Sequence, residues 1–222
     1  MLIIFDLDDT LIDTSGSLTP HRLKRAFERM REAGFATEEP QQALEMLQRL
    51  NETAKSARAA LAEFTEIHQL GEEFFRIGIQ EMYENPLIDI PLPPLDGAPE
   101  LLRSLSLSHP LALVTLGLEE IQREKMKKAG IDSTFFSKII VSSEQSKKPH
   151  YRVIMELLGY PPAKTFVCGD RVEGDLLPAK ELGCRTVRVK RGRGLNDSSP
   201  PFVVDHTIAH LKEIEGILHD HQ

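Results

Sequence analysis

Acidic side chains are crowded together where the first apolar segment of the chain ends. Residues 2–5 read Leu-Ile-Ile-Phe, and Asp6, Asp8 and Asp9 follow directly. Side chains alternate along a strand, so Asp6 and Asp8 are expected on the same side, facing one pocket. An isolated acidic pair would be explained by a turn, in which Asp is common. Three adjacent carboxylates repel one another unless a cation or a reaction uses them, which indicates a chemical site.

Polar residues occupy similar positions at three later points of the sequence. Thr115 ends one apolar segment, Asp170 follows another with Asp175 five residues later, and Lys148 precedes a proline. Each has an ordinary structural interpretation, because most lysines are solvated and Asp175 would also suit a helix N-cap. Ligands of open α/β sheets bind at the carboxyl ends of the strands. We therefore ask whether these positions meet at one edge of a sheet.

Strand patterns alternate with helix patterns outside one long segment. Short apolar runs predict strands, and segments bounded by glycine predict helices. This alternation is typical of βαβ units and predicts a parallel sheet covered by helices on both faces. The expected strands are residues 2–7, 111–115, 138–141, 165–168 and 186–189, and the expected helices are residues 99–106, 119–129, 151–158 and 175–182.

The exception is the segment 14–92, which has no convincing strand pattern. Leu23, Ala26, Phe27 and Met30 form an apolar stripe at three- and four-residue spacing, and three similar stripes follow. Four such helices can bury their stripes against one another as a bundle. The predicted organisation is a core domain of residues 1–13 and 93–222, with a helical domain of residues 14–92 inserted after the first strand.

Composition and charge limit the possible partners of the chain. It has 222 residues and a net charge of −7, from 34 acidic and 27 basic residues. Binding to nucleic acid requires a basic face, so it is not expected. Cys168 and Cys184 are too few for a disulfide framework, and no signal peptide or apolar run of the ~20 residues that span a bilayer is found. We expect a cytoplasmic protein without a membrane partner, a monomer or a homodimer, whose His219–His221 tail is frayed.

The segment Phe5-Asp6-Leu7-Asp8-Asp9-Thr10-Leu11 resembles the signature motif of the haloacid dehalogenase-like hydrolases. The resemblance implies a Rossmann-like, doubly wound parallel sheet with the inserted helical bundle as a cap, expected to act as a lid. It implies that Asp6 attacks phosphorus and that Asp8 is the general acid and base. Three further motifs should follow in a fixed order at strand ends.

The later motifs are identified by the same resemblance. It implies that Thr115 and the following backbone, at Leu116, hydrogen-bond the substrate phosphate, although many relatives carry Asn at that position. Lys148 matches the family lysine because it precedes Pro149, and it is implied to neutralise both the substrate phosphate and the clustered carboxylates. Lys147 is left as an expected surface residue. Asp175 is implied to orient Lys148.

The resemblance also implies magnesium as the cofactor. The ion is expected on the carboxylates of Asp6 and Asp170 and on the backbone carbonyl of Asp8, because magnesium prefers oxygen ligands. To protonate a leaving alkoxide, Asp8 must begin protonated, so we expect its pKa to be raised.

The predicted function is hydrolysis of a small phosphorylated metabolite through an aspartyl-phosphate. Three alternatives stay open. A dehalogenase would share the fold, but a carboxylate metal site serves no purpose in displacing halide from carbon. A phosphomutase would keep all four motifs and differ in the cap. A non-enzymatic receiver-like switch gathers similar residues, but its phosphorylated Asp lies on a later strand and it has no helical insert of this size.

Overall fold

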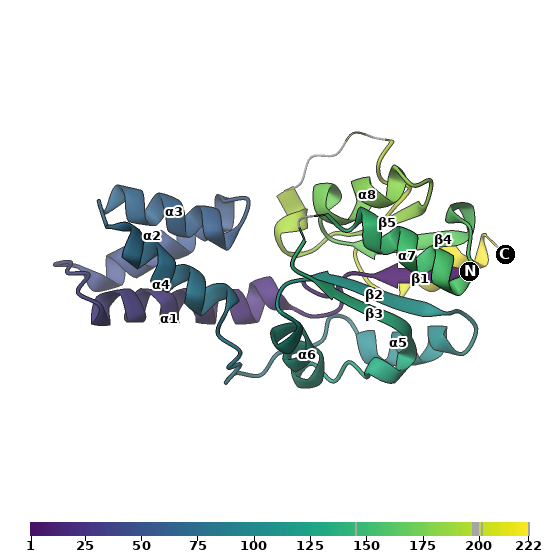
Figure 1. Ribbon diagram of the computed structural model, residues 1–222, viewed down its shortest axis with the longest axis horizontal. Helices are drawn as coiled ribbons and strands as arrows, with labels where there is room; N and C mark the ends of the chain where they lie inside the picture. The colour runs from purple at the N-terminus through teal and green to yellow at the C-terminus, as the bar shows by residue number, and fades with distance from the viewer. Residues whose placement is uncertain (145, 197–199, 201, 222) are drawn as a thin grey trace. The chain divides into compact units, whose positions relative to one another are not determined.

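The computed structural model describes residues 1–144, 146–196, 200 and 202–221. The chain divides into two compact units, a core unit of Met1–Thr14 with Pro91–Gln222 and a helical unit of Ser15–Ile90. Figure 1 shows the sheet in the core unit and a separate group of helices in the other. Among the described residues, no helix is both long enough and apolar enough to cross a bilayer.

A six-stranded sheet in the order β3-β2-β1-β4-β5-β6 forms the centre of the core unit, and all its strand pairs are parallel. β1 therefore lies between β2 and β4, with Phe5 aligned with Leu113 on one side and Cys168 on the other. Because the strands are parallel, their carboxyl ends meet at one edge. The strands are β1 (Leu2–Phe5), β2 (Leu111–Leu116), β3 (Phe136–Ser142), β4 (Thr165–Gly169), β5 (Arg185–Val189) and β6 (His206–Ile208).

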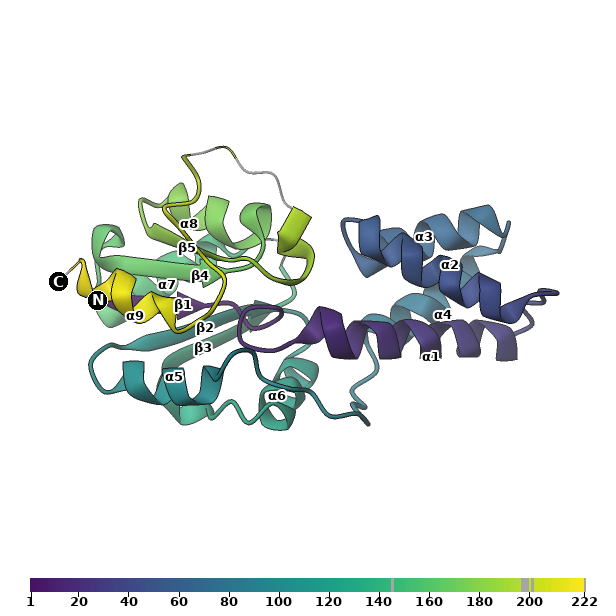
Figure 2. The same ribbon diagram turned by 180° about the vertical axis from the view of Figure 1, so that it is seen from behind.

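Helices cover both faces of this sheet. Figure 1 shows α7 in front of the strands, and Figure 2, from behind, shows α5 and α9 there. Tyr151, Ile154 and Met155 of α7 pack against Ile4 and Val114, as apolar residues at three- and four-residue spacing must. The doubly wound α/β fold predicted from the alternation is confirmed. The helices of this unit are α5 (Ala98–Ser106), α6 (Glu119–Lys128), α7 (Lys148–Leu158), α8 (Leu177–Lys180) and α9 (Glu213–His219).

The sixth strand and the last helix had no counterpart in the sequence prediction. β6 is only three residues long, and its sequence His-Thr-Ile lacks an apolar run. Its pairing with β5 is supported by Asp205, whose carboxylate accepts a hydrogen bond of 2.9 Å from the Thr186 amide. The tail after α9 is also ordered against the core, since the His221 ring lies 5.6 Å from that of Phe166.

The helical unit is a four-helix bundle with an aromatic centre. Phe27, Phe35 and Phe64 contact one another edge-on, with ring centroids 5.8 to 6.1 Å apart. Gly78 of α4 allows close approach to Leu61 of α3, because a Cβ there would lie 2.9 Å from the leucine side chain. The helices are α1 (Thr19–Glu32), α2 (Pro40–Thr53), α3 (Ala57–Ile67) and α4 (Glu72–Tyr83).

Candidate active site

The first acidic residues lie on a strand end and on the turn that follows it. β1 ends at Phe5, and the Asp6 amide extends the ladder by donating to the Cys168 carbonyl over 2.9 Å. The chain then turns sharply, because the amides of Leu11 and Ile12 both donate to the Leu7 carbonyl. Asp8 is therefore on a turn rather than on the strand, and strand alternation does not determine where its side chain lies.

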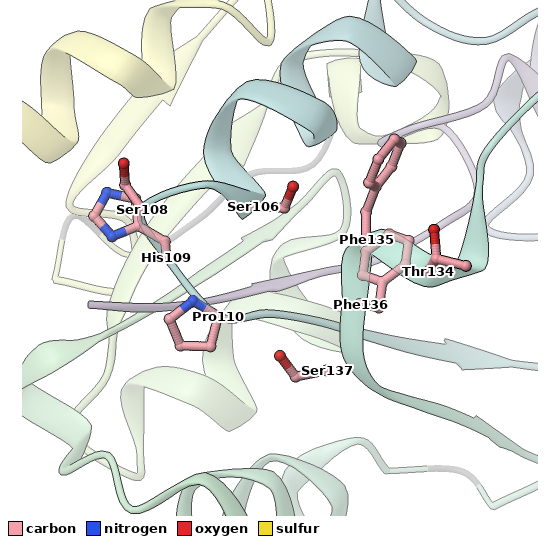
Figure 3. A pocket seen from close by; sticks show the side chains of 8 residues that line it. All are labelled: Ser106, Ser108, His109, Pro110, Thr134, Phe135, Phe136 and Ser137. Carbon is pink, nitrogen blue, oxygen red and sulfur yellow. The ribbon is translucent and has the colours of Figure 1, made fainter.

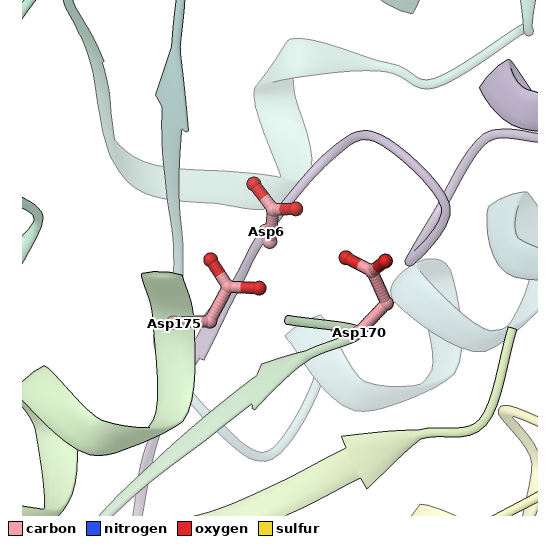
Figure 4. A group of neighbouring side chains, drawn as sticks. All are labelled: Asp6, Asp170 and Asp175. Atoms are coloured by element: carbon pink, nitrogen blue, oxygen red, sulfur yellow. The ribbon is translucent and has the colours of Figure 1, made fainter. Parts of the chain in front are cut away.

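Three buried carboxylates come together at the carboxyl edge of the sheet. Asp6 follows β1, Asp170 follows β4, and Asp175 lies in the helical turn before α8 (Figure 4). One oxygen from each lies within 4.8 Å of the others. Segments more than 160 residues apart in the sequence thus supply one cluster, as expected where neighbouring parallel strands end.

The lysine at this cluster is Lys147. Its Nζ lies 2.5 Å from Asp6 Oδ1 and 2.6 Å from Asp175 Oδ1, and its side chain is 4% exposed. Lys148 instead pairs with Glu181 over 2.8 Å and is 37% exposed. Placing Lys148 beside the carboxylates was wrong, as was treating Lys147 as a surface residue. α7 begins at Lys148, and successive residues of a helix point about 100° apart, so only one of the two lysines can face the cluster.

The second oxygen of Asp175 is also occupied. It accepts a hydrogen bond of 3.0 Å from the Arg171 amide, so Asp175 ties the turn after β4 to Lys147. Gly169 makes this possible, because a Cβ at that position would lie 2.5 Å from Asp175 Cβ and Oδ2. A glycine is therefore required for the close approach of this turn, whatever the chemistry of the site.

The charges of the cluster do not balance. Burial raises the pKa of Asp6 to about 7 despite the opposing effect of Lys147. Burial and the carboxylates of Asp175 and Asp6 raise the pKa of Asp170 to about 9. The Lys147 ammonium contacts Asp6 and Asp175, whereas the ionised form of Asp170 is disfavoured by both of these carboxylates. The donor set consists of oxygens and its charge is uncompensated, which fits a hard divalent cation such as Mg²⁺.

Asp8 is surrounded quite differently. Lys125 Nζ lies 2.8 and 3.0 Å from its two carboxylate oxygens, Gln122 Nε2 donates over 3.0 Å, and Thr14 Oγ1 donates over 2.5 Å. Burial alone would raise the pKa of Asp8, but the Lys125 charge and these hydrogen bonds outweigh it, and the pKa is lowered. The sequence-based expectation of a raised pKa was therefore wrong, because it counted the neighbouring acids without this cation.

Thr115 joins the same network from the end of β2. Gln122 Nε2 donates to Thr115 Oγ1 over 2.5 Å, so one amide bridges Thr115 and Asp8. Leu116, the last residue of β2, is half-buried, and Gly117 follows with a φ of 141°. A Cβ on Gly117 would lie 3.4 Å from the Gln122 side chain, so the glycine admits this approach.

Sequence reasoning missed Gln122 and Lys125. Both are buried polar residues on α6, three positions apart and therefore on one face of the helix. A signal existed, since Ile121 and Met126 flank them in the sequence and predict that this side of the helix packs inward. Their partner Asp8 lies more than 110 residues away along the chain, which no local pattern indicates.

Comparisons with known proteins identify the family of the chain. The family model described as haloacid dehalogenase-like hydrolase matches residues 3–189. Glyceraldehyde 3-phosphate phosphatase of Methanocaldococcus jannaschii is 30% identical, over 97% of this chain and 96% of its own length. A predicted phosphoglycolate phosphatase from Haemophilus somnus has the same fold, with a TM-score of 0.74 at 19% identity, over 98% of this chain and 97% of that one.

A second solved structure is a haloacid dehalogenase-like hydrolase from Bacillus subtilis, which was crystallised with magnesium. It has a TM-score of 0.67 at 20% identity and covers 98% of both chains. Identity at this level shows a shared fold alone. The family match and the archaeal relative both extend over most of the sequence, and the chain belongs to the haloacid dehalogenase-like hydrolases, in their phosphatase branch.

Proposed function

We propose that this protein is a magnesium-dependent phosphatase that hydrolyses a small phosphorylated metabolite through an aspartyl-phosphate on Asp6. The observation that carries the proposal is the buried group of Asp6, Asp170 and Asp175 around Lys147. A carboxylate at a strand end, held by a buried ammonium and facing excess negative charge, is suited to nucleophilic attack on a phosphate ester once a cation is present.

Asp6 and Asp170 are the proposed side-chain ligands of the ion, together with the backbone carbonyl of Asp8. Asp175 is less suited, because both of its oxygens are already engaged by Lys147 and the Arg171 amide. When bound, Mg²⁺ would neutralise the carboxylates and the substrate phosphate and so permit their close approach.

The side chains of the site have separate roles in the transfer of the phosphoryl group. The Asp6 carboxylate forms a bond to phosphorus while the bond from phosphorus to the leaving oxygen breaks. Lys147, fixed by Asp175, stabilises the negative charge that spreads over the phosphoryl oxygens. The Thr115 hydroxyl and the backbone amides after it, at the end of the neighbouring strand β2, are the groups that we propose bind the same oxygens.

Asp8 is the proposed proton carrier. Its two oxygens are fixed by Lys125, Gln122 and Thr14, which define its orientation. An ionised Asp8 can take a proton from the water that hydrolyses the aspartyl-phosphate. For the first step it must hold a proton, and a dianionic substrate arriving nearby favours protonation by adding negative charge.

The first candidate substrate is glyceraldehyde 3-phosphate. The reason is the archaeal relative, which aligns with almost the whole chain and carries that name. We further propose that the helical unit acts as a cap that limits substrates to small molecules. Phosphorylated metabolites should then be hydrolysed, and a phosphopeptide should be left nearly untouched.

The test is a substrate screen joined to a trapping experiment. Purified protein is given glyceraldehyde 3-phosphate, other small phosphate esters, p-nitrophenyl phosphate and a phosphopeptide, with and without Mg²⁺. Rapid acid quenching and mass spectrometry then ask whether one phosphoryl group is on the peptide that contains Asp6. Asp6→Asn should abolish both signals, whereas Asp220→Asn, an exposed carboxylate outside the site, should change neither.

Two outcomes would contradict the proposal. A wild-type protein that hydrolyses esters at full rate after removal of divalent ions has no need of the proposed metal site. A folded Asp6→Asn variant that retains appreciable turnover removes Asp6 as the nucleophile.

A further inference from the structure

A cavity in the core unit lies at the amino ends of the strands, on the side of the sheet opposite to the proposed active site. Its volume is about 500 Å³. Lys164 directly precedes β4 and Arg185 opens β5, so these lining residues stand at the amino ends of the strands. The proposed active site lies at the carboxyl ends. The cavity is lined by Met1, His109, Tyr160, Ala163, Lys164, Arg185 and His221.

Basic groups dominate this cavity. Lys164, Arg185, His109 and His221 line it, and none of the described lining residues is acidic. The chain as a whole carries a net charge of −7, so the basic lining of this cavity differs from the charge of the protein as a whole. Positive charge gathered around a hollow favours an anion inside it.

A neighbouring cavity, by contrast, is not lined by lysine or arginine, so the basic residues are confined to the first cavity. It has a volume of about 430 Å³ and shares His109 with the first, but serine and threonine hydroxyls make up most of its polar lining (Figure 3). None of its lining residues carries a permanent charge. The amino edge of the sheet is thus not basic everywhere.

The guanidinium group is held in place rather than free in solvent. Arg185 lies over the Phe166 ring, 5.6 Å from its centroid, and its Nε donates to the Ala163 carbonyl over 3.4 Å. Its Nη1 contacts His221, with Nε2 of that ring 2.9 Å away. A guanidinium fixed in this way is pre-organised to bind an oxyanion.

The pKa values of two histidines in this region are lowered. Burial lowers the pKa of His109, and burial together with the neighbouring His221 lowers the pKa of His206 despite the carboxylates of Asp205 and Asp220. His206 and His221 are in contact, with ring centroids 5.5 Å apart. A bound anion would favour the charged form of these rings and so raise their pKa values.

We propose that this cavity binds a small organic oxyanion, one that carries a phosphate or more than one carboxylate. Arg185 supplies a planar pair of donors and Lys164 a mobile point charge, the two kinds of group that bind such anions. The cavity is distinct from the active site, since the five residues from Met1 to Asp6 span roughly 17 Å when extended. The inference does not depend on the proposed phosphatase activity.

The test is a titration of the full-length protein, freed of metal over a chelating resin, with inorganic pyrophosphate and, separately, citrate. EDTA is avoided because it is itself a polycarboxylate. Calorimetry measures the affinity, and proton NMR follows the imidazole signals of His109 and His221. We expect saturable binding of at least one probe with shifts of these ring signals. Pyrophosphate alone would indicate a phosphate-bearing ligand, and citrate alone would indicate a polycarboxylate.

Variants of the lining residues test whether the probe binds in this cavity. Lys164→Gln together with Arg185→Gln should weaken binding roughly tenfold or more, because charge-assisted contacts are lost. Lys127→Gln with Lys128→Gln, on the outside of α6, removes the same charge and should leave the affinity unchanged. Lys164→Gln alone tests an exposed side chain, and therefore remains informative if the double variant fails to fold.

Three results would overturn the inference. The first is no binding and no ring shift with either probe. The second is equal loss of affinity in the cavity variant and in the α6 control, which indicates a general charge effect. The third is a double variant with lowered melting temperature while binding of the probe is unchanged, which makes these cations purely structural.

Discussion

The two acidic halves of the candidate site differ in how their charge is balanced. Around Asp6, three buried carboxylates lie together, one ammonium contacts two of them, and the pKa values of Asp6 and Asp170 are raised. Around Asp8, one carboxylate is held by an ammonium, a hydroxyl and an amide that it shares with Thr115, and its pKa is lowered. The two aspartates are only two residues apart and both are largely buried, so their partners decide the direction of the shift.

The two halves therefore differ in whether they require a bound cation. The Asp6 half is incomplete without a cation, which is the physical case for the proposed metal. The Asp8 carboxylate has its partners within the protein, so the geometry of this side chain should not change greatly when metal is removed. Each prediction below disturbs one half and leaves the other in place.

The largest effect is expected from Lys147→Met. Removing the ammonium leaves Asp6 and Asp175 buried without their shared partner, which costs about 3–5 kcal/mol in comparable buried pairs. Activity should fall at least about a hundredfold, because charge on the phosphoryl oxygens loses its cation. Steady-state kinetics and chemical denaturation measure both quantities.

Lys148→Met is the matched control for that variant. Its ion pair with Glu181 is exposed, and its loss should change stability by less than about 1 kcal/mol and leave turnover intact. If Lys148→Met were the more damaging substitution, Lys147 would not be the lysine of the site.

The next prediction concerns pH and metal. In the metal-free protein the pKa values of Asp6 and Asp170 are about 7 and about 9, above the ordinary value near 3.9 for an unfolded Asp. Between about pH 4 and about pH 9, the folded state therefore binds more protons than the unfolded state. Stability of the metal-free protein should fall as pH rises from about 4 to about 9.

Magnesium should reverse that trend, because it replaces the protons on these carboxylates. Its apparent affinity should increase with pH until both groups have ionised. Thermal unfolding across this pH range, with and without Mg²⁺, measures the effect. A metal-free protein whose stability rises over the same interval would show that the carboxylates are not protonated in the folded state.

Prediction from sequence succeeded where the information was local or repeated. Alternation of strands and helices indicated the α/β fold, and that fold is confirmed. β6 escaped prediction because three residues without an apolar run contain no pattern, and its pairing depends on Asp205 and Thr186 from neighbouring segments.

The site shows the same limit at the level of single side chains. Asp6 and Asp170 could be named because each lies near the end of a predicted strand, and Asp175 because it opens a predicted helix, and the structure brings the three together. The choice between Lys147 and Lys148 depends on the residue at which α7 begins, and helix ends are the least predictable part of a helix. Lys125 could not be named at all, since only tertiary packing brings it to Asp8.

A moderate effect is expected from Lys125→Met, which disturbs the Asp8 half alone. Without the ammonium, the pKa of Asp8 should rise, and the pH profile of turnover should move to higher pH. Loss of one charge-assisted contact should lower kcat roughly tenfold on alkyl phosphates and less on p-nitrophenyl phosphate, whose leaving group needs little protonation. Lys128→Met, on the exposed side of the same helix, is the control. An unchanged pH profile would separate Lys125 from proton transfer.

The smallest effect should come from Thr14→Val, which removes one neutral donor from Asp8 and keeps the shape of the side chain. The hydroxyl donates over 2.5 Å, but Lys125 and Gln122 still hold both carboxylate oxygens. A hydrogen bond of this kind contributes about 1 kcal/mol, so kcat should fall by about fivefold and the pH profile should shift only slightly. Thr14→Ser retains the donor and should restore most of the loss, which separates the hydrogen bond from the packing of the methyl group. Metal affinity, governed by the Asp6 half, should be the same in both variants. A Thr14→Val variant with clearly weakened Mg²⁺ binding would show that the two halves are coupled, and that the separation drawn between them is wrong.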